Sequence, residues 1–327
     1  MHSWRDAREW GCAAVTDGLT ASITGTTLRL TAEQWRPLAE AHHRRVDPVI
    51  EDRLQRRARG EKNAVEDFLF EYYPFSTGKL RTWHPGYGVA LEGDVQAYLD
   101  NPAYVRTDDG GATASLMWLN PSRQARLDMV IRILEGTASR PAATGCFALH
   151  EWAMTYRLSQ DAVRHAYLPL RLSPEAIAAT VEEVGLRCTH LDAFRFFTED
   201  AVPLNAFRPT RATQHENEQP GCLHASMDLY KYAFWFSPLI SSDLVMDCFD
   251  VAARAREIDM RASPYDVSPF GLEPIRVETP EGRRQYAVEQ QLMMGVTAHL
   301  REELLERLHG LNAATLASSQ DIGQGAL

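Results

Sequence analysis

Short apolar runs alternate with helix-like segments between residues 66 and 266, and this alternation constrains the fold more than any other feature of the sequence. The apolar runs have the composition of strands and cover 66–76, 145–154, 186–197, 221–238 and 258–266. The helix-like segments have an apolar repeat of helical spacing and cover 120–136, 173–185, 241–257 and 279–310. Strands that alternate with helices are typical of parallel α/β folds. No glycine-rich nucleotide-binding motif follows any run, so the pattern favours a (β/α)8 TIM-like barrel over a doubly wound sheet.

Helices are expected before and after this barrel in the sequence. We predict an N-terminal helical segment over 1–60, the barrel over 61–278, a C-terminal helix over 279–310 and a flexible tail over 311–327. Thr31 and Gln34 form a capping-box pattern at the start of one N-terminal helix. Pro48 predicts a break between two helices, and Gly310 predicts the end of the last one.

Composition limits the classes of partner. The net charge is −10, and acidic residues interleave the one basic run, 42–62, which argues against binding to nucleic acid. No run approaches the roughly 18 apolar residues needed to span a membrane, and the first residues lack the apolar core of a signal peptide. Five cysteines are scattered without a C-x-x-C pair. We therefore expect a cytoplasmic protein with reduced thiols, bound neither to membranes nor to nucleic acid.

Imidazole and carboxylate groups recur in the strand-like runs. Active sites of TIM barrels form where several strands end, so these side chains are expected to converge. On a strand, His190 shares a face with Asp192 and His224 shares one with Asp228, whereas Glu151 points away from His150. The candidate metal ligands are Glu151, His190, Asp192, His224 and Asp228, with His84 and Asp259 as further candidates. The candidates for contact with the metal ligands or with the substrate are Tyr230, Arg261 and Phe194.

Ligands that mix histidine and carboxylate without thiolate suit iron, manganese or zinc. The candidates exceed the number that one catalytic zinc requires, which favours a two-metal centre. The alternatives are buried His–Asp hydrogen bonds and a general base with its orienting carboxylate. A di-iron helical bundle is a weaker alternative: the motifs Glu40-x-x-His43 and Glu306-x-x-His309 are present, but no facing helix offers the inward glutamates. Aromatic residues beside the candidate ligands indicate a pocket for a bulky apolar molecule.

Long motifs in the chain resemble a known family. They are "RRARGEKNAVEDFLFEYYPFSTGKLRTWHPGYGV", "LHEWAM", "HLDAFRFF", "QPGCLHASMDLYKYA" and "DMRASPYD". They resemble actinobacterial proteins that are often labelled 3-methyladenine DNA glycosylase. The chain is also similar to nonheme diiron monooxygenases on a TIM-barrel scaffold in platensimycin and platencin biosynthesis. Asn63 stands where the glycosylase-labelled proteins tend to have a histidine.

The second resemblance implies a nonheme diiron monooxygenase that binds two irons, uses O2 and takes electrons from a reductase or another external donor. Its substrate would be an ent-kaurane- or ent-atisane-type diterpenoid in antibiotic biosynthesis. Two alternatives stay open: a zinc- or manganese-dependent hydrolase or isomerase, and a DNA glycosylase-like repair protein. The acidic composition disfavours the repair protein.

Overall fold

The structure is a computed structural model, and it describes residues 27–324, with side chains described as far as residue 318. Residues 1–26 of the predicted N-terminal segment and residues 325–327 of the predicted tail lie outside this range. The helices are α1 (Ala32–Ala58), α2 (Phe68–Tyr72), α3 (Thr77–Arg81), α4 (Gln96–Leu99), α5 (Pro121–Ser139), α6 (Leu149–Ala153), α7 (Pro174–Val184), α8 (Leu191–Phe194), α9 (Gln214–Asn217), α10 (Leu223–Trp235), α11 (Ser242–Ala262) and α12 (Pro280–Gln324).

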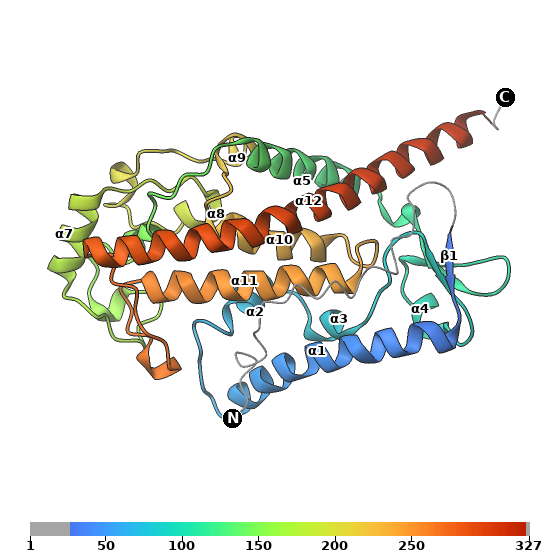
Figure 1. Cartoon of the computed structure of the whole chain (residues 1–327), viewed down its shortest axis with the longest axis horizontal. Coiled ribbons are helices and arrows are strands. Elements are labelled where there is room, and N and C mark those ends of the chain that lie inside the picture. Colours follow the sequence, from blue (N-terminus) through green and yellow to red (C-terminus); the bar gives the residue numbers. More distant parts are fainter. Residues whose placement is uncertain (1–26, 325–327) are drawn as a thin grey trace.

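The strands of the described chain form one small sheet. They are β1 (Leu28–Leu30), β2 (Val89–Leu91), β3 (Tyr104–Arg106) and β4 (Ala112–Ala114), in the order β1-β2-β4-β3. β1 pairs with β2 in parallel, and the other pairs are antiparallel. The sheet lies at one end of the elongated molecule, next to the start of α1 (Figure 1).

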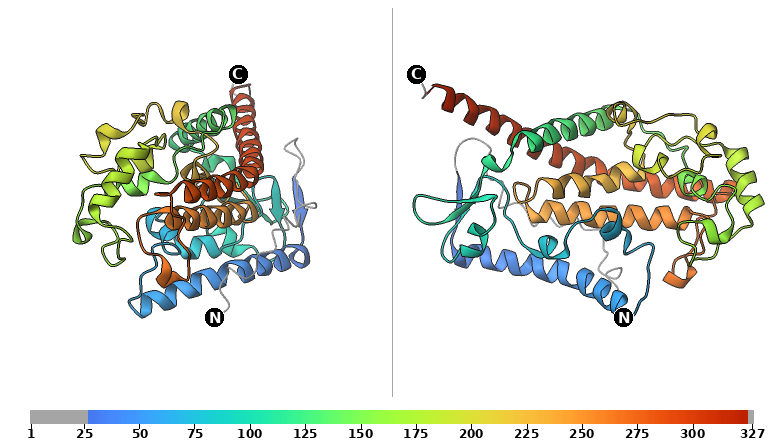
Figure 2. Two further views of the ribbon diagram at one scale, coloured as in Figure 1. Left: turned by 60° about the vertical axis from the view of Figure 1, so that its left-hand side comes forward. Right: turned by 180° about the vertical axis from the view of Figure 1, so that it is seen from behind.

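Long helices make up the body of the molecule. α10 and α11 are joined by a short loop and pack against each other as a helical hairpin, with α12 lying along both. α5 packs on α12 and α9, and α1 lies across the opposite side of α11 (Figures 1 and 2). The elements α6 to α9 lie in the half of the molecule far from the sheet, with α9 next to α5 (Figure 1). They lie in a region of loops that covers one side of α10 (Figure 2).

α10 is the most deeply buried of these helices. Every residue from Leu223 to Ala233 is buried, including His224, Asp228 and Lys231. A helix that is apolar on all sides is stable only inside a core, where other elements cover each face. Polar side chains on such a helix must therefore find their partners within the protein.

The predicted TIM barrel is wrong. Four strands of three residues each cannot form a barrel, and the apolar runs that were expected to be strands are helical. The run 221–238 contains α10, and the runs 145–154 and 186–197 contain α6 and α8. The physical reason is that these runs combine alanine, leucine, methionine and aromatic residues with few β-branched ones, which allows a buried helix as readily as a strand.

Several helix predictions are confirmed. Asn120 caps α5 by accepting a hydrogen bond from the Arg123 amide, and Ser173 caps α7 in the same way. Two predicted boundaries are absent. α1 continues through Pro48, and Val46 and Ile50 on either side of it are both buried against the core. α12 continues past Gly310 to Gln324.

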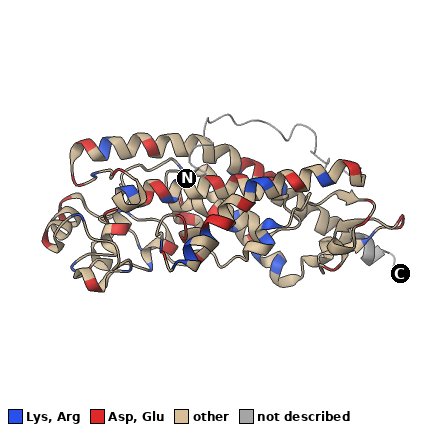
Figure 3. Cartoon of the chain, turned by 90° about the horizontal axis from the view of Figure 1, so that it is seen from below, with Lys and Arg blue, Asp and Glu red and all other residues tan. Residues whose placement is uncertain are grey.

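Two surface properties bear on possible partners. Within residues 27–324, no helix is both long and apolar enough to cross a lipid bilayer. Acidic and basic residues are interspersed along the helices (Figure 3).

The packing of α11 leads to a stability prediction. Met246 is fully buried, whereas Met117 is 88% exposed. We expect Met246→Ala to lower the free energy of unfolding by about 2–5 kcal/mol, because it leaves a cavity between the helices. The control Met117→Ala is expected to change it by less than about 0.5 kcal/mol. Urea unfolding of the two variants measures both values, and equal losses would contradict this account of the core.

Candidate metal centre

Two groups of buried histidines and carboxylates lie in the core of the described chain. The His150 group consists of His150, His224 and Asp259, and the His190 group consists of His190, Glu218 and Asp228. In each group the three possible ligand atoms lie within 4.8 Å of one another. An ion about 2.0–2.2 Å from each of three ligand atoms would separate those atoms by roughly 3–4 Å. Both groups are therefore compact enough to hold a metal ion.

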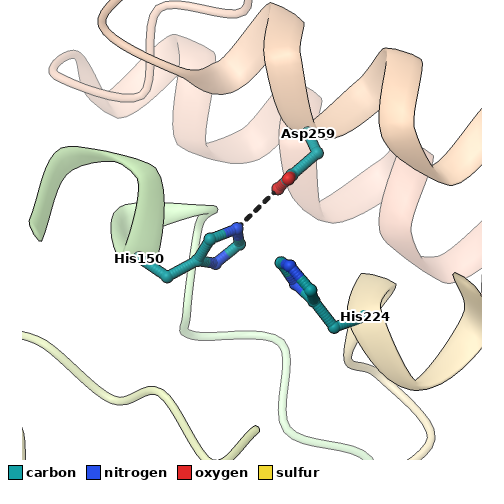
Figure 4. A group of neighbouring side chains, drawn as sticks. All are labelled: His150, His224 and Asp259. Atoms are coloured by element: carbon teal, nitrogen blue, oxygen red, sulfur yellow. Dashed lines mark ion pairs between the residues drawn. The ribbon is translucent and has the colours of Figure 1, made fainter. Parts of the chain in front are cut away.

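Three helices build the His150 group. His150 extends from α6, His224 from the first turn of α10 and Asp259 from α11, and the three side chains point toward one another (Figure 4). The Nε2 atom of His150 lies 2.8 Å from Oδ1 of Asp259. Both atoms are buried, and neither makes a hydrogen bond of good geometry with any residue that the structure describes. Nδ1 of His224 is likewise buried without a partner in the described chain.

The backbone before α6 is strained. Phe147 and Ala148 have φ angles of 44° and 54°, in the left-handed region that residues with a β-carbon rarely adopt. This turn leads directly into α6 and so determines where His150 enters the core. Strained conformations of this kind persist where surrounding packing enforces them, and they cluster at functional sites.

The His190 group comes from two loops and α10. His190 precedes α8, Glu218 follows α9 and Asp228 lies in α10. Nε2 of His190 lies 3.2 Å from Oε1 of Glu218 and 3.3 Å from Oδ2 of Asp228. All three residues are at most 1% exposed, and neither ring nitrogen of His190 makes a hydrogen bond of good geometry within the described chain.

α10 joins the two groups. His224 and Asp228 are four residues apart, so they lie on the same face of the helix, and each belongs to a different group. The ring of His224 lies 4.5 Å from that of His150 and 5.2 Å from that of His190, measured between centroids. The two groups are therefore neighbours, and a pair of ions held by them would share one enclosed centre.

Arg256 neutralises charge beside the His150 group. Its Nη1 atom lies 2.6 Å from Oε1 of Glu151 and 3.2 Å from Oδ2 of Asp259. Asp259 thus has one oxygen held by the guanidinium and the other turned toward His150. Burial would raise the pKa of Glu151, but Arg256, together with the charges on His150 and His165, lowers that pKa to about 2.

Lys231 and two tyrosines hold Asp228. The Lys231 ammonium pairs with Asp228 and lies 3.3 Å from Oδ2 of Asp192. The hydroxyl of Tyr73 donates to Oδ1 of Asp228 at 2.9 Å, and that of Tyr232 donates to Oδ2 at 3.2 Å. These contacts fix the orientation of the carboxylate, as outer partners of metal ligands do.

Burial and neighbouring charges set the protonation of the His150 group. Burial alone would lower the pKa of His150, but the carboxylates of Asp259 and Glu151 together raise it. Burial lowers the pKa of His224 well below its usual value, and the charge on His150 lowers it further. His224 therefore remains neutral, which is the form that binds a metal ion.

Burial and the group's own carboxylates set the protonation of the His190 group. Burial lowers the pKa of His190, whereas Glu218 and Asp228 raise it, and the net change is upward. Burial raises the pKa of Glu218. The pKa of Asp228 is lowered because Lys231 and His190 outweigh its burial. Asp228 is thus an ionised carboxylate throughout the ordinary pH range.

The residues fit a metal centre. Buried polar atoms without a hydrogen bond are unfavourable, and within the described chain such atoms lie on His150, His190, His224 and Asp259. A cation between them would satisfy these atoms. Two histidines with one carboxylate form the ligand set of many nonheme iron oxygenases, and the His190 group adds a set richer in carboxylate.

The structure brings together four of the ligands predicted from the sequence: His190, His224, Asp228 and Asp259. The other three lie outside the two groups. Glu151 pairs with Arg256, and Asp192 lies near Lys231 at the edge of the His190 group. His84 is hydrogen-bonded to the Tyr104 hydroxyl near the sheet, and burial lowers its pKa to about 4.

The residues that were predicted to contact the ligands or the substrate lie outside the two groups. Tyr230 is buried among aromatic rings, and its hydroxyl has no partner in the described chain. Arg261 pairs with Glu289, and Phe194 packs against Phe197, so neither contacts the two groups.

Two members of the groups were missed. His150 was assigned to the face opposite Glu151, because a strand was assumed where α6 forms. Glu218 lies at the end of a short helix in a polar stretch, where the sequence gives no periodic signal. The length of the run 221–238 was an available signal, since strands are usually 4–8 residues long and helices at least 10–12.

The two Glu-x-x-His matches do not form a bundle site. His309 is about half exposed and pairs with Glu135 on α5. His42, next to the other match on α1, hydrogen-bonds to the Leu80 carbonyl.

No protein-family model, curated protein or solved structure matches this chain at a significant level. The function is therefore inferred from the chemistry of the buried groups.

Removal of one ligand should show whether the two groups are distinct metal-binding sites. The wild-type chain is expected to bind two divalent ions, and His224→Ala is expected to bind one, because only the His150 group loses a ligand. His309→Ala removes a half-exposed histidine and should leave two ions bound. Metal analysis after equilibrium dialysis measures these ratios. Unchanged binding in His224→Ala would exclude the His150 group as a site.

Metal should also stabilise the fold. An ion that binds only the folded chain adds about 2.7 kcal/mol when its free concentration is 100 times its Kd. We therefore expect the melting temperature to fall when a chelator removes the metal and to recover when the metal is restored. Differential scanning calorimetry measures this change, and Asp259→Asn should show a smaller recovery than the wild type.

Proposed function

We propose that this protein is a nonheme diiron monooxygenase that hydroxylates an unactivated C–H bond of a bulky apolar substrate. The observation that carries the proposal is the adjacency of the His150 and His190 groups, each buried and each offering three ligands. Three protein ligands leave open positions on a metal ion, as catalytic centres require. Two such ions side by side are typical of dinuclear catalysis.

The ligand chemistry favours iron. Two imidazoles with one carboxylate suit ferrous iron that reacts with O2, and no thiolate takes part in either group. When bound, the iron pair would supply reduction of O2 and oxidation of the C–H bond. Overall, the substrate, O2, two electrons and two protons give the hydroxylated product and water. The electrons come from a reductase or another external donor.

The protein's own residues orient and shield this centre. Arg256 holds the outer oxygen of Asp259, and Tyr73 and Tyr232 hold Asp228. Near-complete burial of both groups keeps bulk water away from the ligand atoms. A dry site strengthens the electrostatic interactions within it and suppresses side reactions.

Aromatic residues beside the His190 group favour an apolar substrate. Tyr73 contacts Asp228 through its hydroxyl and packs its ring against Phe75 and Tyr230. Phe234 stacks on Phe75 with centroids 4.1 Å apart. The unpartnered Tyr230 hydroxyl would give an otherwise apolar wall one polar contact. The resemblance noted above extends this proposal to an ent-kaurane- or ent-atisane-type diterpenoid from antibiotic biosynthesis.

We place the protein in the cytoplasm. The cysteines of the described chain, Cys146, Cys188, Cys222 and Cys248, are all free. Free thiols are compatible with a reducing compartment.

Metal content and O2 consumption test the proposal together. We expect about two irons per chain after anaerobic loading with ferrous iron, as in dinuclear sites. With a chemical reductant and an ent-kauranoid acid, 18O2 should place one labelled oxygen in the product, as mass spectrometry would show. His190→Ala should abolish this incorporation, whereas His309→Ala should retain it. Tight binding of zinc or manganese without O2 consumption would overturn the proposal in favour of a hydrolase or isomerase.

A further inference from the structure

A line of aromatic rings runs from the His190 group to the protein surface. The Tyr232 hydroxyl donates to Asp228, and the Tyr232 ring lies 5.6 Å from the Trp235 ring between centroids. Tyr232 is 1% exposed, whereas Trp235, at the end of α10, is only half-buried. The line therefore connects a buried ligand to solvent within two turns of one helix.

Arginines cover the outer end of this line. The Arg126 guanidinium lies 4.9 Å from the Trp235 ring, and that of Arg123 lies 4.2 Å from the Trp118 ring. Arg123 and Arg126 are three residues apart on α5 and so lie on one face. Met117, next to Trp118, is 88% exposed. These residues, Met117, Trp118, Arg123, Arg126 and Trp235, are called the Trp235 surface below.

The Trp235 surface has a local positive charge on an acidic protein. The chain has a net charge of −10, yet Arg123 and Arg126 form no ion pair with any residue of the described chain. Arg123 donates to the Trp118 carbonyl, which fixes it over the ring. Unpaired arginines beside aromatic rings favour contact with an acidic protein partner.

We propose that Tyr232 and Trp235 conduct electrons to the metal centre from a small acidic iron–sulfur protein that docks on the Trp235 surface. The inference rests on the proposed function, which requires two electrons for each hydroxylation. The donor is oxidised by one electron in each of two encounters. The electron passes through Tyr232 and Trp235 by tunnelling, so neither ring is oxidised or reduced, and the two protons are taken up from solvent into the product water.

Lys231 favours inward transfer along this line. Its ammonium lies 4.8 Å from the Tyr232 ring and 5.6 Å from the Trp235 ring. A nearby positive charge opposes removal of an electron from either ring, and it attracts an electron that moves toward the centre. The two rings are therefore suited to electron transfer toward the centre, and Lys231 disfavours an oxidised tyrosine or tryptophan at these positions.

A second aromatic line leaves the same carboxylate. Tyr73 donates to Asp228, and its ring lies 4.9 Å from that of Tyr72. The outer end of this line is covered by Arg195, which lies 3.5 Å from Asp192. This cation already has a carboxylate partner, so it offers less attraction to an acidic donor. Tyr72→Leu is accordingly the matched control for Trp235→Leu.

Stopped-flow reduction tests the route without turnover. The ferric, iron-loaded chain is mixed anaerobically with a reduced plant-type [2Fe–2S] ferredoxin, in the absence of substrate and O2. We expect Trp235→Leu to lower the limiting rate of reduction by about tenfold or more, the change produced by about 1.4 kcal/mol in the activation barrier. Tyr72→Leu should keep the wild-type rate, and dithionite should reduce all three proteins equally.

Binding measurements test the surface. We expect Arg126→Glu to raise the Kd for the ferredoxin by about tenfold, with an effect that shrinks as salt increases. A Kd that is unchanged by Arg126→Glu would overturn the docking surface. Equal limiting rates for Trp235→Leu and the wild type would overturn the route.

Iron content separates this inference from the proposed function. A wild-type chain that binds no iron contradicts the proposed function, and the route fails with it. An iron-loaded chain that consumes O2 but does not depend on Trp235 overturns the route alone.

Discussion

Carboxylates buried in a helical core need countercharges, and much of this structure is arranged around that need. An ionised group taken out of water without a partner destabilises the fold by several kcal/mol. Asp259 finds Arg256 one turn away on α11, and Asp228 finds Lys231 one turn away on α10. Each pair uses side chains of the same helix, so the countercharge comes from the helix that carries the carboxylate. α10 and α11 can then form a buried hairpin that carries ligands on its inner faces.

The sequence predicted the helices better than the architecture. Capping residues such as Asn120 and Ser173 act locally, and their helices begin where the sequence indicates. The barrel was wrong because apolar runs do not reveal by themselves whether they form strands or buried helices. In 221–238 the length of the run favours a helix, and the pairing of Asp228 with Lys231 three residues later fits helical spacing.

The candidate centre was predictable in its chemistry but not in its full membership. His190, His224, Asp228 and Asp259 stand out because ionisable residues are rare in apolar segments, whatever structure those segments adopt. The assignment of Glu151 depended on a strand that is absent, and Arg256 takes up its charge. Glu218 lies beside a short helix that only the tertiary fold brings to His190. Local sequence patterns contain no information about a contact of this kind.

The countercharges also make the two groups unequal. Around the His150 group, two carboxylates (Asp259 and Glu151) share one guanidinium, which is planar, always charged and fixed by several contacts. Around the His190 group, Asp228 and Asp192 share the Lys231 ammonium, and Asp192 also lies 3.5 Å from Arg195. The His190 group itself contains two carboxylates, Glu218 and Asp228, whereas the His150 group contains one. By Coulomb's law each ionised carboxylate adds attraction for a cation, and the Lys231 ammonium beside Asp228 opposes that attraction. The difference in countercharge arises from residues that are not ligands, so the surroundings of the centre distinguish its two halves as well as the ligands do.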